Sequence, residues 1–87
     1  MATATTTELE AITPAKVIDA RGAACPGPLL EAKKGMGGVP VGSIMEIWST
    51  DPGTKTDIAA WSGKIGHSFL GVIEDAGYDR VFVQRGK

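Results

Sequence analysis

The stretch that decides the fold runs from residue 16 to residue 36 and consists of KVIDARGAACPGPLLEAKKGM. It begins with two adjacent β-branched residues, Val17 and Ile18, which predict a short buried strand. After a loop of small residues, apolar side chains recur at helical spacing, at Leu29, Ala32 and Met36. The stretch therefore predicts a strand followed by an amphipathic helix.

Beyond this unit, a turn rich in glycine and proline leads to a compact apolar segment over residues 44–48, which predicts a second strand. A second helix is expected to begin after the turn at residues 50–54, where Thr54 and Asp57 approximate a capping box. Its end is expected near Gly66. The buried stripe of this helix is expected to consist of Ile58, Trp61 and Ile65.

Two further strands are predicted at residues 68–74 and 80–85, joined by a tight turn in which Gly77 supplies a positive backbone angle. Gly71, inside the first of them, indicates a bulge, a close contact with a helix or a tolerated weak spot. The order of elements is β-α-β-α-β-β. This order predicts an α+β two-layer sandwich, in which a four-stranded mixed sheet carries two helices on one face.

Residues 1–14 are rich in Thr and Ala, show no apolar stripe and end in a proline. We expect a flexible N-terminal tail here. The folded domain is expected to span residues 15–87, and a chain of this length has room for one hydrophobic core. Because so short a chain encloses little volume, its chemistry is expected at the surface.

Composition argues against several classes of function. Nine Lys and Arg residues against ten Asp and Glu residues give a formal net charge of -1, so direct nucleic-acid binding is not expected. No window approaches the roughly 18 apolar residues that cross a bilayer, and no secretory signal is recognised, so no membrane contact is expected. One cysteine and one histidine argue against a structural zinc site, and no cofactor is implied. A lone thiol persists best in a reducing compartment, so we expect a cytoplasmic protein.

The only cysteine, Cys25, directly precedes two prolines, Pro26 and Pro28. Prolines in a first helical turn forfeit few hydrogen bonds and preset the helical backbone angle, so we expect Cys25 at the cap of this helix. There the helix dipole favours the thiolate and lowers the thiol pKa modestly, with Arg21 as a candidate cation. The alternative is that Cys25 is a small buried hydrophobe. The rigid first turn and the lack of another candidate nucleophile favour an exposed, reactive thiol.

Four segments follow one another along the chain: DARG at residues 19–22, CPGP at 25–28, TDPGT at 50–54 and DI at 57–58. In this order they resemble the TusA/SirA-like sulfur-carrier family. The resemblance spans most of residues 16–86, and the Cys-Pro-x-Pro element is its specific part. It implies the same two-layer sandwich that the pattern of elements predicts.

The resemblance implies that Cys25 accepts sulfane sulfur from a donor protein as a persulfide and passes it to the next protein of a relay. Such a protein is a carrier rather than a stand-alone turnover enzyme. The donor is expected to be a rhodanese-like protein or a cysteine desulfurase, and the acceptor a DsrE-like protein or another relay thiol. Pro26 and Pro28 match the motif that shapes the helix start, while Arg21 and Asp51 match family positions near it.

Some members of the family carry a second cysteine in the second helix, where this chain has Ala60, Trp61 and Ser62. An internal disulfide is therefore excluded, and Cys25 must exchange sulfur with partner proteins. We expect a monomer that serves the oxidation of inorganic sulfur compounds. Sulfur supply to tRNA thiolation or to cofactor assembly is the other destination.

Two other classes of function stay open. One is a thiol-independent protein-interaction or regulatory module, and the other is an RNA-binding domain, by analogy with the fold of a bacterial translation initiation factor.

His67 is expected to be a solvated or capping residue rather than a catalytic one. Trp48 and Trp61 are expected to pack in or beside the core. The scattered lysines are expected only to solvate the helices; these are Lys33, Lys34 and Lys64.

Overall fold

The computed structural model describes residues 6–24 and 26–87, which form three helices and four strands. In chain order these are α1 (Thr6–Glu10), β1 (Lys16–Asp19), α2 (Gly27–Met36), β2 (Ile44–Ser49), α3 (Thr54–Ile65), β3 (Ser68–Asp75) and β4 (Tyr78–Gln84). All four strands and both longer helices begin and end within two residues of the predicted limits. Among the described residues, no helix has the length and apolar character required to cross a bilayer.

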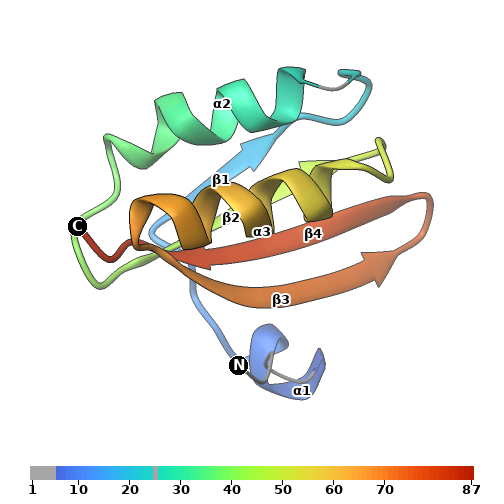
Figure 1. Ribbon diagram of the computed structural model, residues 1–87. Helices are drawn as coiled ribbons and strands as arrows, with labels where there is room; N and C mark the ends of the chain where they lie inside the picture. The colour runs from blue at the N-terminus through green and yellow to red at the C-terminus, as the bar shows by residue number, and fades with distance from the viewer. Residues whose placement is uncertain (1–5, 25) are drawn as a thin grey trace.

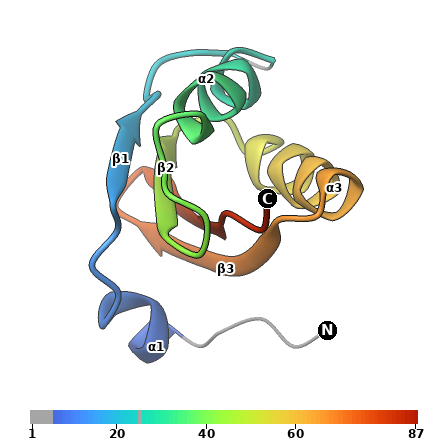
Figure 2. The same cartoon turned by 90° about the vertical axis from the view of Figure 1, so that its left-hand side faces the viewer.

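The four strands form one sheet in the order β1-β2-β4-β3. β1 runs parallel to β2, whereas β4 is antiparallel to both of its neighbours. The two longer helices, α2 and α3, lie on the same face of this sheet (Figure 1, Figure 2). The predicted α+β sandwich with a four-stranded mixed sheet is thereby confirmed.

The core between the sheet and these two helices is made of side chains that alternate along the central strands. The buried members from β2 and β4 are Met45, Ile47, Val81 and Val83. Small residues bring α2 close to β1, because Ala32 is fully buried and a Cβ at Gly35 would overlap with the side chain of Ile18. Gly35 therefore allows the helix to approach the sheet and does not end the helix, which continues to Met36.

The buried stripe of α3 differs from the predicted one. Ile58 is fully buried and Trp61 packs partly buried against the core, but Ile65 is 44% exposed. Ser62 is fully buried instead, and its hydroxyl donates a hydrogen bond of 2.8 Å to the carbonyl of Ile58. A hydroxyl that is satisfied in this way costs little to bury. Ile65 is the last helical residue, before the left-handed C-cap residue Gly66.

The capping box predicted at the start of α3 is wrong. The N-cap residue is Gly53, and no side chain makes a capping hydrogen bond. The hydroxyl of Thr54 is buried and lies 2.7 Å from the hydroxyl of Ser49 at the end of β2. Each hydroxyl would be costly to bury alone. Their mutual hydrogen bond therefore ties the start of α3 to the sheet.

β3 and β4 form the predicted hairpin, whose two-residue turn contains Gly77 at a φ of +80°. Of the possibilities left open for Gly71, the bulge is the one observed, because the register shifts between Phe69 and Gly71. The extra residue changes the side-chain alternation along β3. As a result, Leu70 and Ile73 both pack on the face of the sheet remote from α2 and α3.

Within the tail predicted for residues 1–14, the segment Thr6–Glu10 forms α1, which lies on that second face (Figure 1, Figure 2). Leu9 is only 1% exposed and packs with Ile73 and Phe82. The carboxylate of Glu10 lies 4.0 Å from the guanidinium of Arg80 on β4. An apolar strip on the sheet that would otherwise face water accounts for the docking of so short a helix. Residues 1–5 of the predicted tail lie outside the described residues.

Leu9→Ala is expected to lower the free energy of unfolding by about 2 kcal/mol, because it removes a buried side chain and leaves a cavity over Phe82. Thr7→Ala, at an exposed position of the same helix, is expected to change this free energy by less than about 0.5 kcal/mol. Urea denaturation measures both. Equal stability of Leu9→Ala and the unsubstituted protein would show that α1 does not dock on the sheet.

Candidate functional site

One end of the molecule gathers the ends of β1 and β2 and the starts of α2 and α3. Because β1 and β2 run parallel, the loops that follow them leave the sheet at the same edge (Figure 1). Among the described residues, this end contains the predicted site residues Arg21, Pro26, Pro28 and Asp51. Cys25 itself lies outside the described residues.

α2 begins one residue later than predicted. Its N-cap residue is Pro26, at φ -94° and ψ 18°, and no side chain makes a capping hydrogen bond. The predicted cap at Cys25 is therefore displaced by one position. A turn precedes the helix, in which the N–H of Gly27 donates to the carbonyl of Ala24 at 2.7 Å. The two chain neighbours of residue 25, Ala24 and Pro26, are both exposed.

The first turn of α2 offers few amide donors. Pro26 and Pro28 have no N–H, and the N–H of Gly27 is already bonded to Ala24. Pro28 is buried in the helix layer, which anchors this turn. An anion next to the turn is therefore stabilised mainly by the helix dipole rather than by direct amide hydrogen bonds.

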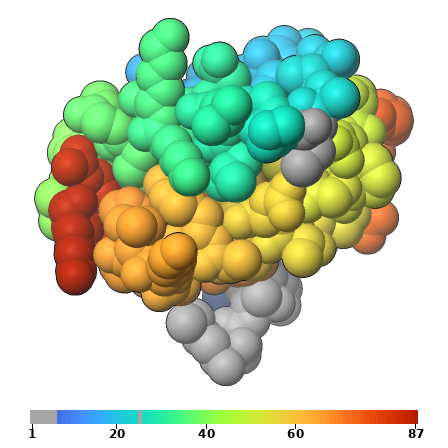
Figure 3. All heavy atoms as spheres, turned by 45° about the horizontal axis from the view of Figure 1, so that its top comes forward, coloured from blue at the N-terminus to red at the C-terminus, as the bar shows by residue number. Residues whose placement is uncertain are grey.

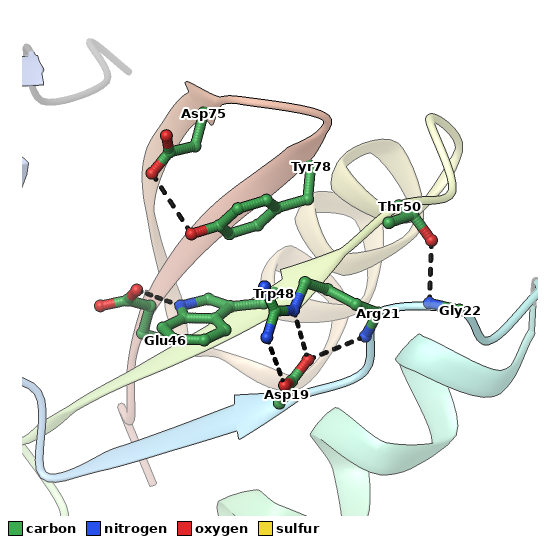
Figure 4. Close-up of polar contacts among 8 residues, drawn as sticks. All are labelled: Asp19, Arg21, Gly22, Glu46, Trp48, Thr50, Asp75 and Tyr78. Carbon is green, nitrogen blue, oxygen red and sulfur yellow. Dashed lines mark hydrogen bonds and ion pairs between the residues drawn. The ribbon is translucent and has the colours of Figure 1, made fainter.

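Hydrogen bonds hold the two loops of this end in place. The N–H of Gly22 donates to the hydroxyl of Thr50 at 2.9 Å and joins one loop to the other (Figure 4). Within the second loop, the N–H of Asp51 donates to the hydroxyl of Ser49 at 3.1 Å, and the carboxylate of Asp51 accepts the N–H of Gly53 at 2.9 Å. Asp51 therefore shapes the loop that faces residues 22–24.

An open hollow of about 270 Å³ lies between these loops, lined by Gly22, Ala23, Ala24, Thr50 and Asp51. Its walls are small side chains and main chain, with one carboxylate. The hollow is smaller than the roughly 300–1,000 Å³ of pockets that bind organic ligands. It suits a side chain or a group of a few atoms offered by a docking molecule.

The guanidinium of Arg21 is held on the sheet face that α2 and α3 leave uncovered. It forms a two-point ion pair with Asp19, at 2.9 Å from Nε and 2.8 Å from Nη2, and lies over the rings of Trp48 and Tyr78 (Figure 4). The hydrogen bonds from Arg21 lower the pKa of the Asp19 carboxyl to about 2. A cation whose charge is balanced by a carboxylate stabilises a second anion less. Because Cys25 lies outside the described residues, the role of Arg21 as a cation near the thiol stays a prediction.

Several residues of this end were not singled out in the sequence. Glu46 is only 3% exposed, and its carboxylate accepts hydrogen bonds from Nε1 of Trp48 and, at 2.8 Å, from Nε of Arg80. Side chains two residues apart on a strand lie on the same face, so the sequence could have predicted the contact between Glu46 and Trp48. Arg80 comes from β4, and its position depends on the register of β2 with β4.

The rim beyond the loops is acidic. A second hollow of about 290 Å³ at this end is lined in part by Glu74, Asp75 and Asp79, and Lys55 forms an ion pair of 3.0 Å with Asp79. Within residues 6–24 and 26–87, no group of three or more His, Cys, Asp or Glu side chains is arranged to hold a metal ion.

Comparison with known proteins gives consistent matches. The family model described as sulfurtransferase TusA matches residues 16–85. YrkI of Bacillus subtilis, provisionally named a sulfur carrier protein, is 39% identical over 71 residues, which cover 82% of this chain and 95% of YrkI. The sulfur carrier protein TusA of Pseudomonas putida GB-1 is 35% identical over 65 residues, 75% of this chain and 81% of that protein.

A solved structure supports the fold. The crystal structure of a SirA-like protein from Desulfitobacterium hafniense superposes with a TM-score of 0.71 and covers 83% of this chain and 99% of that one, at 20% sequence identity. At this identity the likeness concerns the fold alone. The segment that carries α1 precedes the residues matched by the family model.

Arg21→Gln is expected to raise the pKa of Asp19 from about 2 toward its ordinary value of 3.8, because the substitution removes the cation and the charged donors. A carboxyl-carbon NMR titration measures this pKa. Lys55→Gln also removes one positive charge from this end, but Lys55 pairs with Asp79, so the pKa of Asp19 is expected to stay near 2. An unchanged pKa in Arg21→Gln would contradict the pairing.

The same pair predicts the sign of a pH effect. The folded-state pKa of Asp19 is depressed, so its contribution to stability is present above about pH 4 and is lost as the pH falls through about 2. Between these two pH values, the free energy of unfolding of Arg21→Gln is expected to fall less than that of the unsubstituted protein. Thermal denaturation at several pH values tests this difference, and parallel curves would contradict it.

Proposed function

Because this chain belongs to the TusA sulfurtransferase family, we propose that it is a sulfur carrier that holds sulfane sulfur on Cys25 as a persulfide and relays it to partner proteins. The observation that carries the proposal is the position of the chain's only thiol. It stands in the family's Cys-Pro-x-Pro motif, in the segment that joins the exposed Ala24 to the exposed Pro26.

The transfer is a thiol exchange that needs no external oxidant. The Cys25 thiolate attacks the terminal sulfur of a donor persulfide, the sulfur–sulfur bond of the donor breaks, and the donor cysteine leaves as a thiolate. Cys25 then carries the persulfide. In the second step an acceptor thiolate attacks the same terminal sulfur, and Cys25 is released as a thiolate. Sulfur atoms and electrons balance in both steps.

The described surroundings support a carrier rather than a stand-alone enzyme. The hollow lined by Gly22, Ala24 and Asp51 is small and open, which suits a cysteine presented by another protein. The chain's only histidine, His67, follows the far end of α3, so no imidazole base belongs to this end. The donor and acceptor proteins therefore supply the groups that complete each transfer.

The partners that we propose are those that the resemblance to the family implies. A rhodanese-like protein or a cysteine desulfurase is the donor that we propose, and a DsrE-like protein or another relay thiol is the acceptor. With one cysteine in the chain, release of sulfur requires a thiol of another protein. Oxidation of inorganic sulfur compounds is the pathway we favour, ahead of tRNA thiolation and cofactor assembly. A reducing cytoplasm would keep this thiol available.

A thiol-independent interaction module is the second candidate, favoured by the exposed, charged surfaces at both ends of the molecule. Cys25→Ala discriminates between the two. A carrier loses sulfur transfer completely in this variant, whereas an interaction module keeps its cellular function. Complementation of a deletion strain with Cys25→Ala decides between them.

Incubation with a rhodanese and thiosulfate, or with a cysteine desulfurase and cysteine, is expected to add one sulfur atom, about 32 Da, to the intact protein. Cys25→Ser is expected to gain no mass, because its hydroxyl does not form a persulfide. Intact-protein mass spectrometry before and after treatment with dithiothreitol measures the gain and its reversal. Equal labelling of both proteins would remove Cys25 from the mechanism.

A further inference from the structure

The end of the molecule opposite the loops carries another hollow, of about 460 Å³. It lies where the last turns of α2 and α3 meet the C-terminal segment (Figure 2, Figure 3). We call it the distal groove. Its apolar surface comes from Met36 on α2 and from Trp61 and Ile65 on α3. Ile65 is 44% exposed and is one of four large apolar side chains that the described residues leave exposed.

One wall of the distal groove is fixed by the C-terminal segment. The N–H of Gly86 donates to Nδ1 of His67 at 2.9 Å, and the main chain of Arg85 forms bonds of 2.8 and 2.9 Å with Gly42 and Ser43. A Cβ at Gly86 would overlap with the carbonyl of Gly66, so the segment lies directly on the α3–β3 junction. The groove is therefore a formed feature and not a gap beside a loose chain end.

Three cations line the distal groove, Lys33, Arg85 and Lys87, and no acidic side chain does. Within the described part of the chain, none of the three forms a salt bridge with a carboxylate side chain. The guanidinium of Arg85 donates to the carbonyls of Met36 and Val39, at 3.2 and 2.7 Å, where it also caps the end of α2. Nε of Arg85 also donates to a main-chain oxygen of Lys87 at 2.6 Å, and together these bonds fix the position of the guanidinium.

The potential in the distal groove is positive. Burial, followed by the charges of Arg85 and Lys87, lowers the pKa of His67 below its ordinary value of 6.5. The ring of His67 lies edge-on to Trp61 at 5.2 Å. With Nδ1 accepting from Gly86, the neutral ring carries its proton on Nε2. The groove thus combines three cationic side chains, an aromatic ring and one further N–H donor.

We propose that the distal groove docks a segment of a partner protein in which an apolar side chain is flanked by carboxylates. The apolar side chain would pack on Trp61 and Ile65, and the carboxylates would pair with Lys33 and Lys87. Charge complementarity argues for this partner, because the net charge of the chain is -1 and yet this groove is cationic. A nucleic acid is disfavoured, since three cations support few phosphate contacts and the groove is short.

The distal groove is separate from the thiol end. β2 runs from Ile44 near the groove to Ser49 at the loops, and six residues of strand span about 17 Å. A partner docked in the groove therefore leaves the end that carries Cys25 open to a second protein. The docking surface does not depend on sulfur chemistry, so Cys25→Ser is expected to bind the same segment with the same affinity.

The test uses an acetylated and amidated hexapeptide, Asp-Glu-Leu-Phe-Glu-Asp, as the probe. Titration into the ¹⁵N-labelled full chain is expected to give saturable shifts in the amides around Met36 and His67 and in the indole N–H of Trp61, with a dissociation constant below about 1 mM at low salt. A peptide with Gly-Gly in place of Leu-Phe is expected to bind about tenfold more weakly. A peptide with Lys in place of every acidic residue is expected not to bind.

Matched pairs of charge reversals distinguish binding in the distal groove from attraction to the overall charge of the protein. Lys33→Glu combined with Lys87→Glu is expected to weaken binding by about tenfold or more. Lys34→Glu combined with Lys64→Glu changes the net charge equally on α2 and α3 at residues that do not line the groove, and is expected to change affinity by less than about threefold. Ile65→Ser is expected to weaken binding without loss of the fold, because Ile65 is exposed.

Three results would overturn the proposal. They are the absence of saturable shifts in the unsubstituted protein, equal losses in the two double variants, and tighter binding of a ten-nucleotide RNA than of the hexapeptide at the same salt. Failure of the hexapeptide to bind, with normal persulfide formation on Cys25, would reject the groove and leave the carrier function standing. Normal binding of the hexapeptide without persulfide formation on Cys25 would support the groove and reject the carrier function.

Discussion

The parallel pairing of β1 with β2 is the constraint on which the rest of the structure depends. It sends the loops after both strands to one edge of the sheet, where the N–H of Gly22 bonds to the hydroxyl of Thr50. It also requires a crossover, which α2 supplies, and the crossover fits because Gly35 lets the helix lie directly on Ile18. Without this pairing, the first turn of α2 and the loop of Asp51 would not share one end of the molecule.

The two ends of the molecule differ in charge, and this difference suits a protein that meets several partners. At the loop end, acidic side chains form the rim, and Arg21 is balanced by Asp19 and stacked on aromatic rings. At the other end, three cationic side chains and no acidic side chain line the distal groove. Electrostatic steering therefore favours different surfaces at the two ends. A carrier built this way has one end for exchange and another for docking.

Most of the fold was predictable because each element carries its own local signal. Strand alternation, helical spacing and the glycines at turns predicted the limits of all four strands and both longer helices. The failures have a common cause, which is contact between residues that belong to different elements. Thr54 bonds to Ser49 instead of capping its helix, and Leu9 docks because Ile73 and Phe82 offer an apolar strip across the sheet. Ser49 is only five residues from Thr54 but belongs to the preceding strand, and the partners of Leu9 lie on β3 and β4, so the pattern within one element predicts neither contact.

The candidate site likewise has features that the sequence predicts and features that only the tertiary structure shows. The sequence by itself determined that the chain has one thiol, that this thiol precedes a proline-rich helix start, and that the chain folds as an α+β sandwich, because these depend on residue identity and on periodicity. Only the tertiary structure decided that Arg21 is paired with Asp19, that Glu46 is buried against Arg80, and that scattered lysines and an exposed isoleucine meet in one groove. Charges act through distances in space, and spacing along the chain does not report those distances until the strands are paired and the helices are packed.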